Sequence, residues 1–265
     1  MKVGVFDSGI GGLSVLKEIR RQLPRATLLY IADNAYAPYG DRDHSFIVKR
    51  ALQLSEFLVT QEVAAIVIAC NTASVHAAKS VRAVCAVPVI AMEPAIKPAA
   101  LLSRSKVIAV LATSQTIASE NVAQLVATYH HQVQVLLQAC PGLVEHIELG
   151  DLSSAALRSK LSAYLRPLIN QGADTIVLGC THYPFLAPLI REMVGPGVQL
   201  IDPAPAVARE LVRRLGPLYT NAATGLEETS MDGAHSFYSS APSMSLKDVM
   251  SNILRYELEL QALPI

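Results

Sequence analysis

Two cysteines of this chain stand where a thiol could do chemistry. Cys70 follows the apolar run of AIVIACNTAS (residues 65–74), and Cys180 follows that of TIVLGCTHYP (residues 175–184). Hydroxyl, amide or imidazole groups come directly after each thiol. Racemisation by two bases places one acid/base group on each side of a carbon atom, because one removes a proton and the other delivers a proton to the opposite face. The two stretches therefore predict proton transfer at a carbon centre, if the fold makes the thiols face each other.

The apolar runs before these cysteines predict buried strands of parallel sheets, in which ligands bind beyond the carboxyl ends of the strands. Each thiol would then lie at the N-terminus of the next helix. Free amides and a partial positive charge at that position lower the pKa of a thiol and bind carboxylates. Pro184 is typical of a first helical turn and supports a helix start soon after Cys180. Cys85 and Cys140 lack this setting, and we expect them to be small buried hydrophobic residues.

Further polar residues are expected around the first thiol. FDSGIGG (residues 6–12) puts Asp7 and Ser8 at the end of the first predicted strand, in the same layer as Cys70. The glycines of this stretch would permit a tight turn into the following helix. APYG (residues 37–40) is a turn sequence that could bring the backbone amides of Tyr39 and Gly40 over the same cleft.

Around the second thiol, His182 stands two residues past Cys180, close enough to tune or relay its proton. The stretch PGLVEHIELG (residues 141–150) holds two glutamates, Glu145 and Glu148, and the sequence leaves open which of them faces the site.

The elements that must position these residues alternate between strand and helix along the whole chain. Short apolar runs predict strands at residues 3–6, 27–32, 64–69, 87–91, 107–111, 133–137, 175–178 and 198–201. Helices are expected between them, for instance at residues 45–60, 153–170 and 204–215. This rhythm is typical of parallel sheets built from right-handed crossovers. The fold class is therefore α/β.

The chain also repeats itself. KVGVFDSG resembles KVIAVLATS, VIACNTAS resembles VLGCTHYP, and VIAMEPA resembles QLIDPAP, in the same order and at nearly constant separation. The repeat predicts two similar domains with parallel sheets flanked by helices and a cleft between them. We expect residues 1–96 and 207–265 to form the first domain and residues 97–206 the second. A polar loop at 219–235 and a last helix at 246–259 are expected to return to the first domain.

Composition narrows the function classes. The 265 residues are 51% hydrophobic and 17% charged, with 22 basic and 22 acidic side chains, so no electrostatic footprint for nucleic acid or an anionic membrane is present. No apolar run is long enough to span a bilayer, and the N-terminal apolar stretch is too short for a signal peptide. The four cysteines have no metal-site spacing. These features indicate a cytoplasmic protein with free thiols and no bound metal.

The stretches FDSGIGGLSV, PYG, ACNTAS and LGCTHYP together resemble the glutamate racemase family, the cofactor-independent two-cysteine amino-acid racemases. The similarity runs through the full chain and includes FYSS near the C-terminus. It implies interconversion of L- and D-glutamate without a cofactor, which supplies D-glutamate for bacterial peptidoglycan. It also implies two α/β domains with the site between them, and a homodimer.

The resemblance assigns roles to individual residues. Cys70 would exchange the proton of D-glutamate and Cys180 that of L-glutamate, with Asp7, His182 and Glu148 assisting. The substrate would be held by Asp7, Ser8, Tyr39, Gly40, Asn71, Thr72, Thr181 and His182.

Three other functions fit parts of the sequence. Gly9, Gly11 and Ser14 nearly form a dinucleotide-binding turn, with Asp33 as the ribose acid, but Asp7 would repel a pyrophosphate. A two-domain protein that binds an amino acid without chemistry would need no paired thiols. A two-thiol racemase for aspartate or another amino acid is the alternative nearest to the predicted function.

Overall fold

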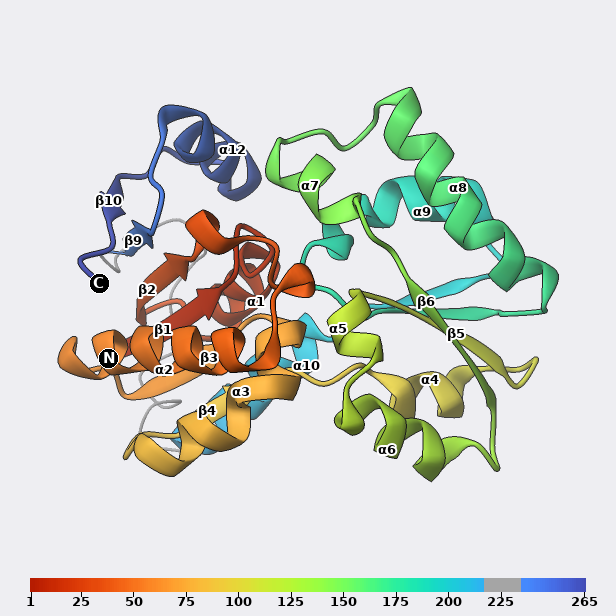
Figure 1. Cartoon of the computed structure of the whole chain (residues 1–265), viewed down its shortest axis with the longest axis horizontal. Helices are drawn as coiled ribbons and strands as arrows, with labels where there is room; N and C mark the ends of the chain where they lie inside the picture. Colours follow the sequence, from red (N-terminus) through yellow and green to blue (C-terminus); the bar gives the residue numbers. More distant parts are fainter. Residues whose placement is uncertain (217–234) are drawn as a thin grey trace.

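The computed structural model describes residues 1–216 and 235–265 (Figure 1). In this part of the chain, two parallel sheets form the two halves of the molecule. The first sheet has the strand order β10-β9-β2-β1-β3-β4, and the second has the order β6-β5-β7-β8. The strands of the first sheet are β1 (Lys2–Asp7), β2 (Thr27–Ala32), β3 (Ala65–Ile68), β4 (Val89–Ala91), β9 (Ser236–Ser239) and β10 (Leu260–Ala262). Those of the second are β5 (Val107–Ala112), β6 (Gln134–Ala139), β7 (Thr175–Leu178) and β8 (Gln199–Ile201).

Helices cover both faces of each sheet, as expected for an α/β fold. In chain order they are α1 (Leu13–Gln22), α2 (His44–Thr60), α3 (Asn71–Val84), α4 (Ile96–Leu102), α5 (Ser114–Ile117), α6 (Glu120–Tyr129), α7 (Leu143–Glu148), α8 (Ala155–Asn170), α9 (Ala187–Val194), α10 (Ala204–Leu215) and α12 (Met244–Leu254). The described residues also form the short 3₁₀ segments η1 (Asn34–Tyr36), η2 (Tyr39–Asp41) and η3 (Tyr183–Leu186). None of the helices in the described residues is both long and apolar enough to cross a membrane.

The order of the strands confirms the repeat that the sequence predicts. In the first sheet β2-β1-β3-β4 are neighbours, and in the second β6-β5-β7-β8 follow the same order, all paired in parallel. The eight predicted strands are all present. Because β3 and β7 occupy equivalent places, the residues that follow them leave their sheets at equivalent edges.

Burial alternates along the strands, since successive side chains point to opposite faces of a sheet. Leu28 and Tyr30 of β2 face α1, α10 and α12, whereas Leu29 and Ile31 face α2 and α3. In the second sheet, one face packs on α4 and α6 and the other on α7, α8 and α9. One apolar cluster includes α1, α10 and α12 together with α7, α8 and α9, so the cores of the two halves are continuous.

The C-terminal segment differs from the prediction. The last helix, expected at 246–259, is α12 and ends at Leu254, because Arg255 adopts a left-handed backbone with φ 62°. The sequence pattern did not reveal β9 and β10. Strand β9 pairs in parallel with β2, and β10 pairs in parallel with β9. Most of the expected polar loop at 219–235 lies outside the described residues.

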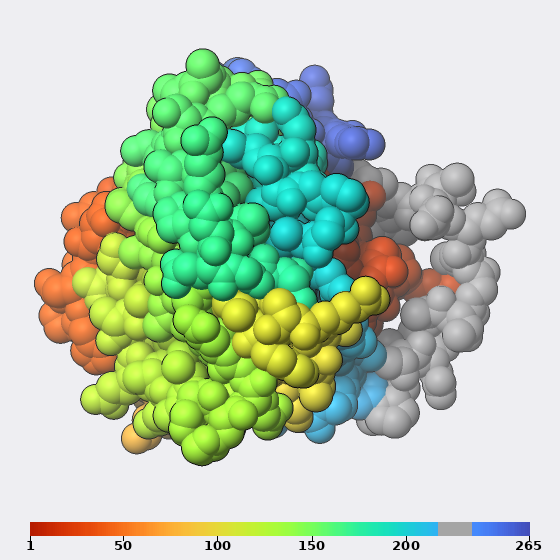
Figure 2. All heavy atoms as spheres, turned by 90° about the vertical axis from the view of Figure 1, so that its right-hand side faces the viewer, coloured from red at the N-terminus to blue at the C-terminus, as the bar shows by residue number. Residues whose placement is uncertain are grey.

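The sheets support the predicted division of the chain, which remains a proposal: residues 1–96 and 207–265 form one domain, and residues 97–206 the other. Helix α4 joins the core cluster of the second sheet, while α10 packs against α1. Viewed from the side of the second sheet, yellow to cyan residues form a continuous surface, and the blue C-terminal segment lies behind it at the top (Figure 2).

Candidate active site

Cys70 lies between β3 and α3, at the N-cap position of the helix. Its backbone is extended, with φ −138° and ψ 119°, and its sulfur accepts a hydrogen bond from the Ala73 amide at 3.5 Å. The thiol faces the end of β1, where it donates to Ser8 Oγ at 3.7 Å. The predicted position of Cys70 is therefore confirmed.

The predicted lowering of the thiol pKa is wrong for Cys70. Burial raises the pKa of Cys70 well above its ordinary value, and the nearby Asp7 carboxylate raises it further. The hydrogen bond from Ala73 offsets only part of this increase. At Cys70 the desolvation of the buried sulfur therefore outweighs the effect of the helix N-terminus on the thiol pKa.

Cys180 follows β7 after a single glycine. The α-helix expected directly after it is replaced by η3, which has Pro184 in its first turn, and α9 begins only at Ala187. The sulfur of Cys180 lies 3.7 Å from Nδ1 of His182. The two-residue spacing thus brings the imidazole to the thiol, as the sequence predicts.

His182 is bound on its other side by Glu148. Its Nε2–H donates to Oε1 of Glu148 at 2.6 Å. Burial alone would lower the pKa of His182, but its contacts with Cys180 and Glu148 raise the pKa well above its ordinary value. Glu148, the last residue of α7, is therefore the glutamate that faces the site, while Glu145 is exposed.

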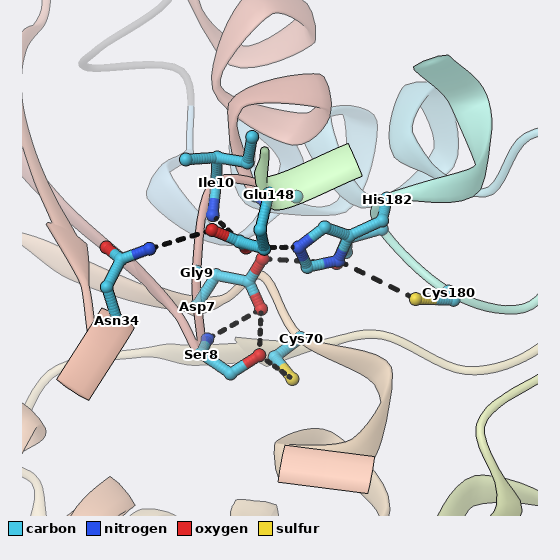
Figure 3. A network of polar contacts seen from close by, with 12 residues as sticks. Asp7, Ser8, Gly9, Ile10, Asn34, Cys70, Glu148, Cys180 and His182 are labelled. Carbon is cyan, nitrogen blue, oxygen red and sulfur yellow. Dashed lines mark hydrogen bonds and ion pairs between the residues drawn. The ribbon is translucent and has the colours of Figure 1, made fainter. Parts of the chain in front are cut away.

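Glu148 also joins the two halves of the molecule (Figure 3). Its Oε1 accepts a hydrogen bond from the Ile10 amide at 2.8 Å, and its Oε2 accepts one from Asn34 Nδ2 at 2.8 Å. Both donors belong to the first half, in the loops that follow β1 and β2. The sequence gave no sign of these two partners, because they lie more than a hundred residues from Glu148 along the chain.

Asp7 is the carboxylate on the Cys70 side. It is fully buried and accepts hydrogen bonds from Ser8 N at 2.7 Å and from the Gly12 amide. Thr181 Oγ1, from the second half, donates to it at 3.2 Å. Burial raises the pKa of Asp7, and the His182 side chain partly opposes this. Asp7 can therefore hold a proton near neutral pH more readily than an exposed aspartate.

The glycines after Asp7 have a role that differs from the expected one. Gly9 and Gly11 do not have the left-handed backbone that a tight glycine turn would need. A Cβ atom on Gly9 would collide with the Glu148 carboxylate, and one on Gly11 would collide with His182 and Thr181. Glycine is required here because side chains of the second half pack directly on this backbone.

Both thiols line one enclosed cavity between the halves. Its lining residues are Ser8, Pro38, Tyr39, Gly40, Cys70, Asn71, Thr72, Thr113, Val144, Cys180, Thr181 and His182. All of the predicted substrate-binding residues except Asp7 line it, and Asp7 lies directly beneath Ser8. The space that the centre of a water molecule can reach is only about 10 Å³, roughly the room for one water.

Asn71 is the lining residue whose polar atoms lack a protein partner. Both Nδ2 and Oδ1 are buried and have no hydrogen-bond partner among the described residues. Burying an amide in this way is unfavourable, so its two polar atoms are left for a ligand. By contrast, the Thr72 hydroxyl bonds to Thr113 Oγ1 at 2.9 Å and Thr116 Oγ1 at 3.2 Å.

Thr113 is a lining residue that was not predicted. It directly follows β5, in the place that Ser8 occupies after β1. The internal repeat could have identified it, because the repeat relates the ends of these two strands.

The turn at residues 37–40 is anchored by hydrogen bonds to the buried Asp33. Tyr39 OH donates to Asp33 Oδ2 at 2.5 Å, and Arg50 donates to Asp33 Oδ1 at 2.7 Å. Asp33 is completely buried, so it is not available to a ribose. The Gly12 amide, which a pyrophosphate would need, is bonded to Asp7. These contacts argue against the dinucleotide-binding function.

Comparison with known proteins agrees with this geometry. A family model described as Asp/Glu/hydantoin racemase matches residues 3–211. The chain belongs to this family. A glutamate racemase from Methylococcus capsulatus is 49% identical over 241 residues, which cover 91% of this chain and 87% of that protein.

Solved structures from the same family have the same two-domain fold. The glutamate racemase isoform RacE1 from Bacillus anthracis matches with a TM-score of 0.84 and 30% identity, covering 99% of this chain and 97% of that one. Glutamate racemase from Francisella tularensis, solved in complex with D-glutamate, matches with a TM-score of 0.82 and 32% identity, with coverage of 99% and 97%. The predicted family resemblance and fold class are thereby confirmed.

Proposed function

We propose that this protein interconverts L- and D-glutamate without a cofactor, using Cys70 and Cys180 as the two acid/base groups. One observation carries the proposal: two thiols from equivalent ends of β3 and β7 line the same enclosed cavity. The glutamate racemases among the relatives support glutamate as the substrate.

In the proposed reaction one thiolate removes the proton from Cα, and the opposite thiol donates a proton to the other face. Cys70 would exchange the proton of D-glutamate, and Cys180 that of L-glutamate. Asp7 is the group near Cys70 that can take up the thiol proton, since its own pKa is raised. His182 has the corresponding role at Cys180, because its Nδ1 faces the sulfur and its Nε2–H is held by Glu148.

The substrate groups find partners in the same cavity. The unpaired amide of Asn71 and the hydroxyl of Thr72 lie at the start of α3, where free backbone amides bind carboxylates. Ser8, Tyr39, Gly40, Thr181 and Asp7 complete the proposed binding residues.

The test is direct. Reduced and extensively dialysed protein is incubated with L-glutamate, and the optical rotation is followed to zero. The same measurement with L-aspartate tests the alternative substrate. Loss of rotation with L-glutamate but not with L-aspartate is expected. No change with L-glutamate, or activity only after pyridoxal phosphate is added, would contradict the proposal.

The setting of the reaction is part of the proposal. The enzyme would act in the cytoplasm as a homodimer. Its product, D-glutamate, would be used for bacterial peptidoglycan. Light scattering of the purified protein measures the dimer, and D-glutamate auxotrophy of a deletion strain measures the role in cell-wall synthesis.

A further inference from the structure

A line of polar contacts runs from β9 through Asn34 to Glu148. Asn34 is the first residue of η1, directly after β2, and its Nδ2 donates to Glu148 Oε2 at 2.8 Å (Figure 3). Asn34 itself touches neither thiol and does not line the cavity. Asn34 contacts the catalytic groups through its hydrogen bond to the carboxylate of Glu148, which in turn binds His182.

The orientation of the Asn34 amide is set by β9. Ser239, which is fully buried, donates its hydroxyl to Asn34 Oδ1 at 3.4 Å and accepts from the Ala241 amide at 3.0 Å. The next residue, Ser240, accepts from the Ala35 amide at 3.0 Å. Because the Ser239 oxygen already has a donor, it favours the carbonyl end of Asn34 on its side, which leaves the NH₂ end for Glu148.

The contact completes the hydrogen bonding of Glu148. Oε1 accepts from both His182 Nε2 and the Ile10 amide, and Oε2 accepts from Asn34. With both oxygens held, the carboxylate cannot rotate away from the imidazole. A neutral amide provides this restraint without cancelling the charge of Glu148, as a lysine or an arginine would.

We propose that Asn34, held by Ser239, is a positioning residue that directs Glu148 at His182 and so supports proton transfer at Cys180. This inference rests on the proposed racemase function, which it deepens. The titratable groups that face Glu148 are His182, Asp7 at the end of β1 and Tyr30 on β2.

The experiment compares Asn34→Asp with Asn34→Ala. The aspartate has the same shape but places a carboxylate against Glu148, so kcat/KM for glutamate should fall about tenfold or more at pH 8. At pH 6 a proton shared between the two carboxyl groups restores a donor, and kcat/KM relative to wild type should recover at least about threefold. Asn34→Ala should lose activity by the same factor at both pH values. Asn121→Asp, at an exposed site on α6, is the matched control and should behave as wild type.

Two further measurements test the role of Asn34 separately from the proposed racemase function. Ser239→Ala should lower kcat/KM in the same direction as Asn34→Ala but by a smaller factor. In the free protein, NMR titration of the His182 ring should give a higher pKa in Asn34→Asp than in wild type, because a second negative charge lies beyond Glu148. This titration reports on the contact even if wild-type protein does not racemise glutamate, an outcome that would contradict only the proposed function. Wild-type kcat/KM in both Asn34 variants, or a loss in Asn34→Asp that is equal at both pH values with an unchanged His182 titration, would overturn the inference.

Discussion

Replacing Gly11 with alanine tests whether the two halves must close tightly for catalysis. The added Cβ would collide with the imidazole of His182 and would lie 2.5 Å from Oγ1 of Thr181. Neither group can give way easily. His182 is held between Cys180 and Glu148, and Thr181 Oγ1 is bonded to Asp7.

The size of the effect follows from the cost of overpacking. Forcing one methyl group into a filled site costs about 1–3 kcal/mol, which corresponds to a loss of about 5-fold to about 150-fold in kcat/KM. The collision exists only when the second half packs on the first. Thermal unfolding of the variant should therefore change much less than its catalysis.

The assay is the initial rate of D-glutamate formation from L-glutamate, together with a thermal unfolding curve. Gly197→Ala is the matched control, because Gly197 has no left-handed backbone and a Cβ there would meet nothing within 4 Å. The control should keep wild-type activity. A folded Gly11→Ala variant with kcat/KM within twofold of wild type would show that this close contact is not needed for turnover.

Three other predictions follow from the site and its surroundings. Cys70→Ser and Cys180→Ser should each lower kcat at least about a hundredfold, because an alcohol cannot replace a thiolate as base, whereas Cys85→Ser should stay active; equal losses in all three folded variants would contradict the assignment. Asn71→Ala should raise the KM for glutamate about tenfold without destabilising the free protein, since the amide has no protein partner to lose; a large fall in stability with unchanged KM would contradict this. Burial alone would raise the pKa of Asp174, but hydrogen bonds from the loop before β5 lower this pKa to about 2. The ionised Asp174 side chain therefore stabilises the fold above pH 4, and this contribution is lost as the pH falls toward 2. Asp174→Asn should therefore cost about 1 kcal/mol in urea unfolding at pH 7 and less at pH 3, and a difference that grows on acidification would refute the reasoning.

The sequence predicted the strands and the repeat because buried parallel strands are marked by short apolar runs, such as Ile66–Val67–Ile68 before Cys70. It also predicted most of the cavity, since the residues after equivalent strands must meet at one edge. The short strand β9 escaped detection because its four residues, Ser-Phe-Tyr-Ser, contain no apolar run like those of the predicted strands. Strand β9 forms because it pairs with β2, and a contact between segments so far apart in the chain leaves no local sequence pattern.

The parts of the site that sequence could not predict depend on contacts between distant segments. The raised pKa of Cys70 follows from burial between the two halves, whose effect is larger than that of the helix N-terminus that the sequence predicts. The choice of Glu148 over Glu145 depends on the rotation of α7 relative to His182. The bond from Asn34 to Glu148 is likewise a product of how the two halves pack.

Hydrogen exchange in heavy water distinguishes two thiols that act on opposite faces of one carbon atom from a single base that serves both faces. The reaction is followed at low conversion from L-glutamate and, separately, from D-glutamate. With one thiol on each face, we expect the product enantiomer to carry solvent deuterium at Cα in both directions. The remaining substrate should stay mostly protiated, because the abstracting thiol returns its own proton to the same face. Substantial transfer of the substrate hydrogen into the product enantiomer would contradict opposed roles for Cys70 and Cys180, since a single base would then be carrying one proton across.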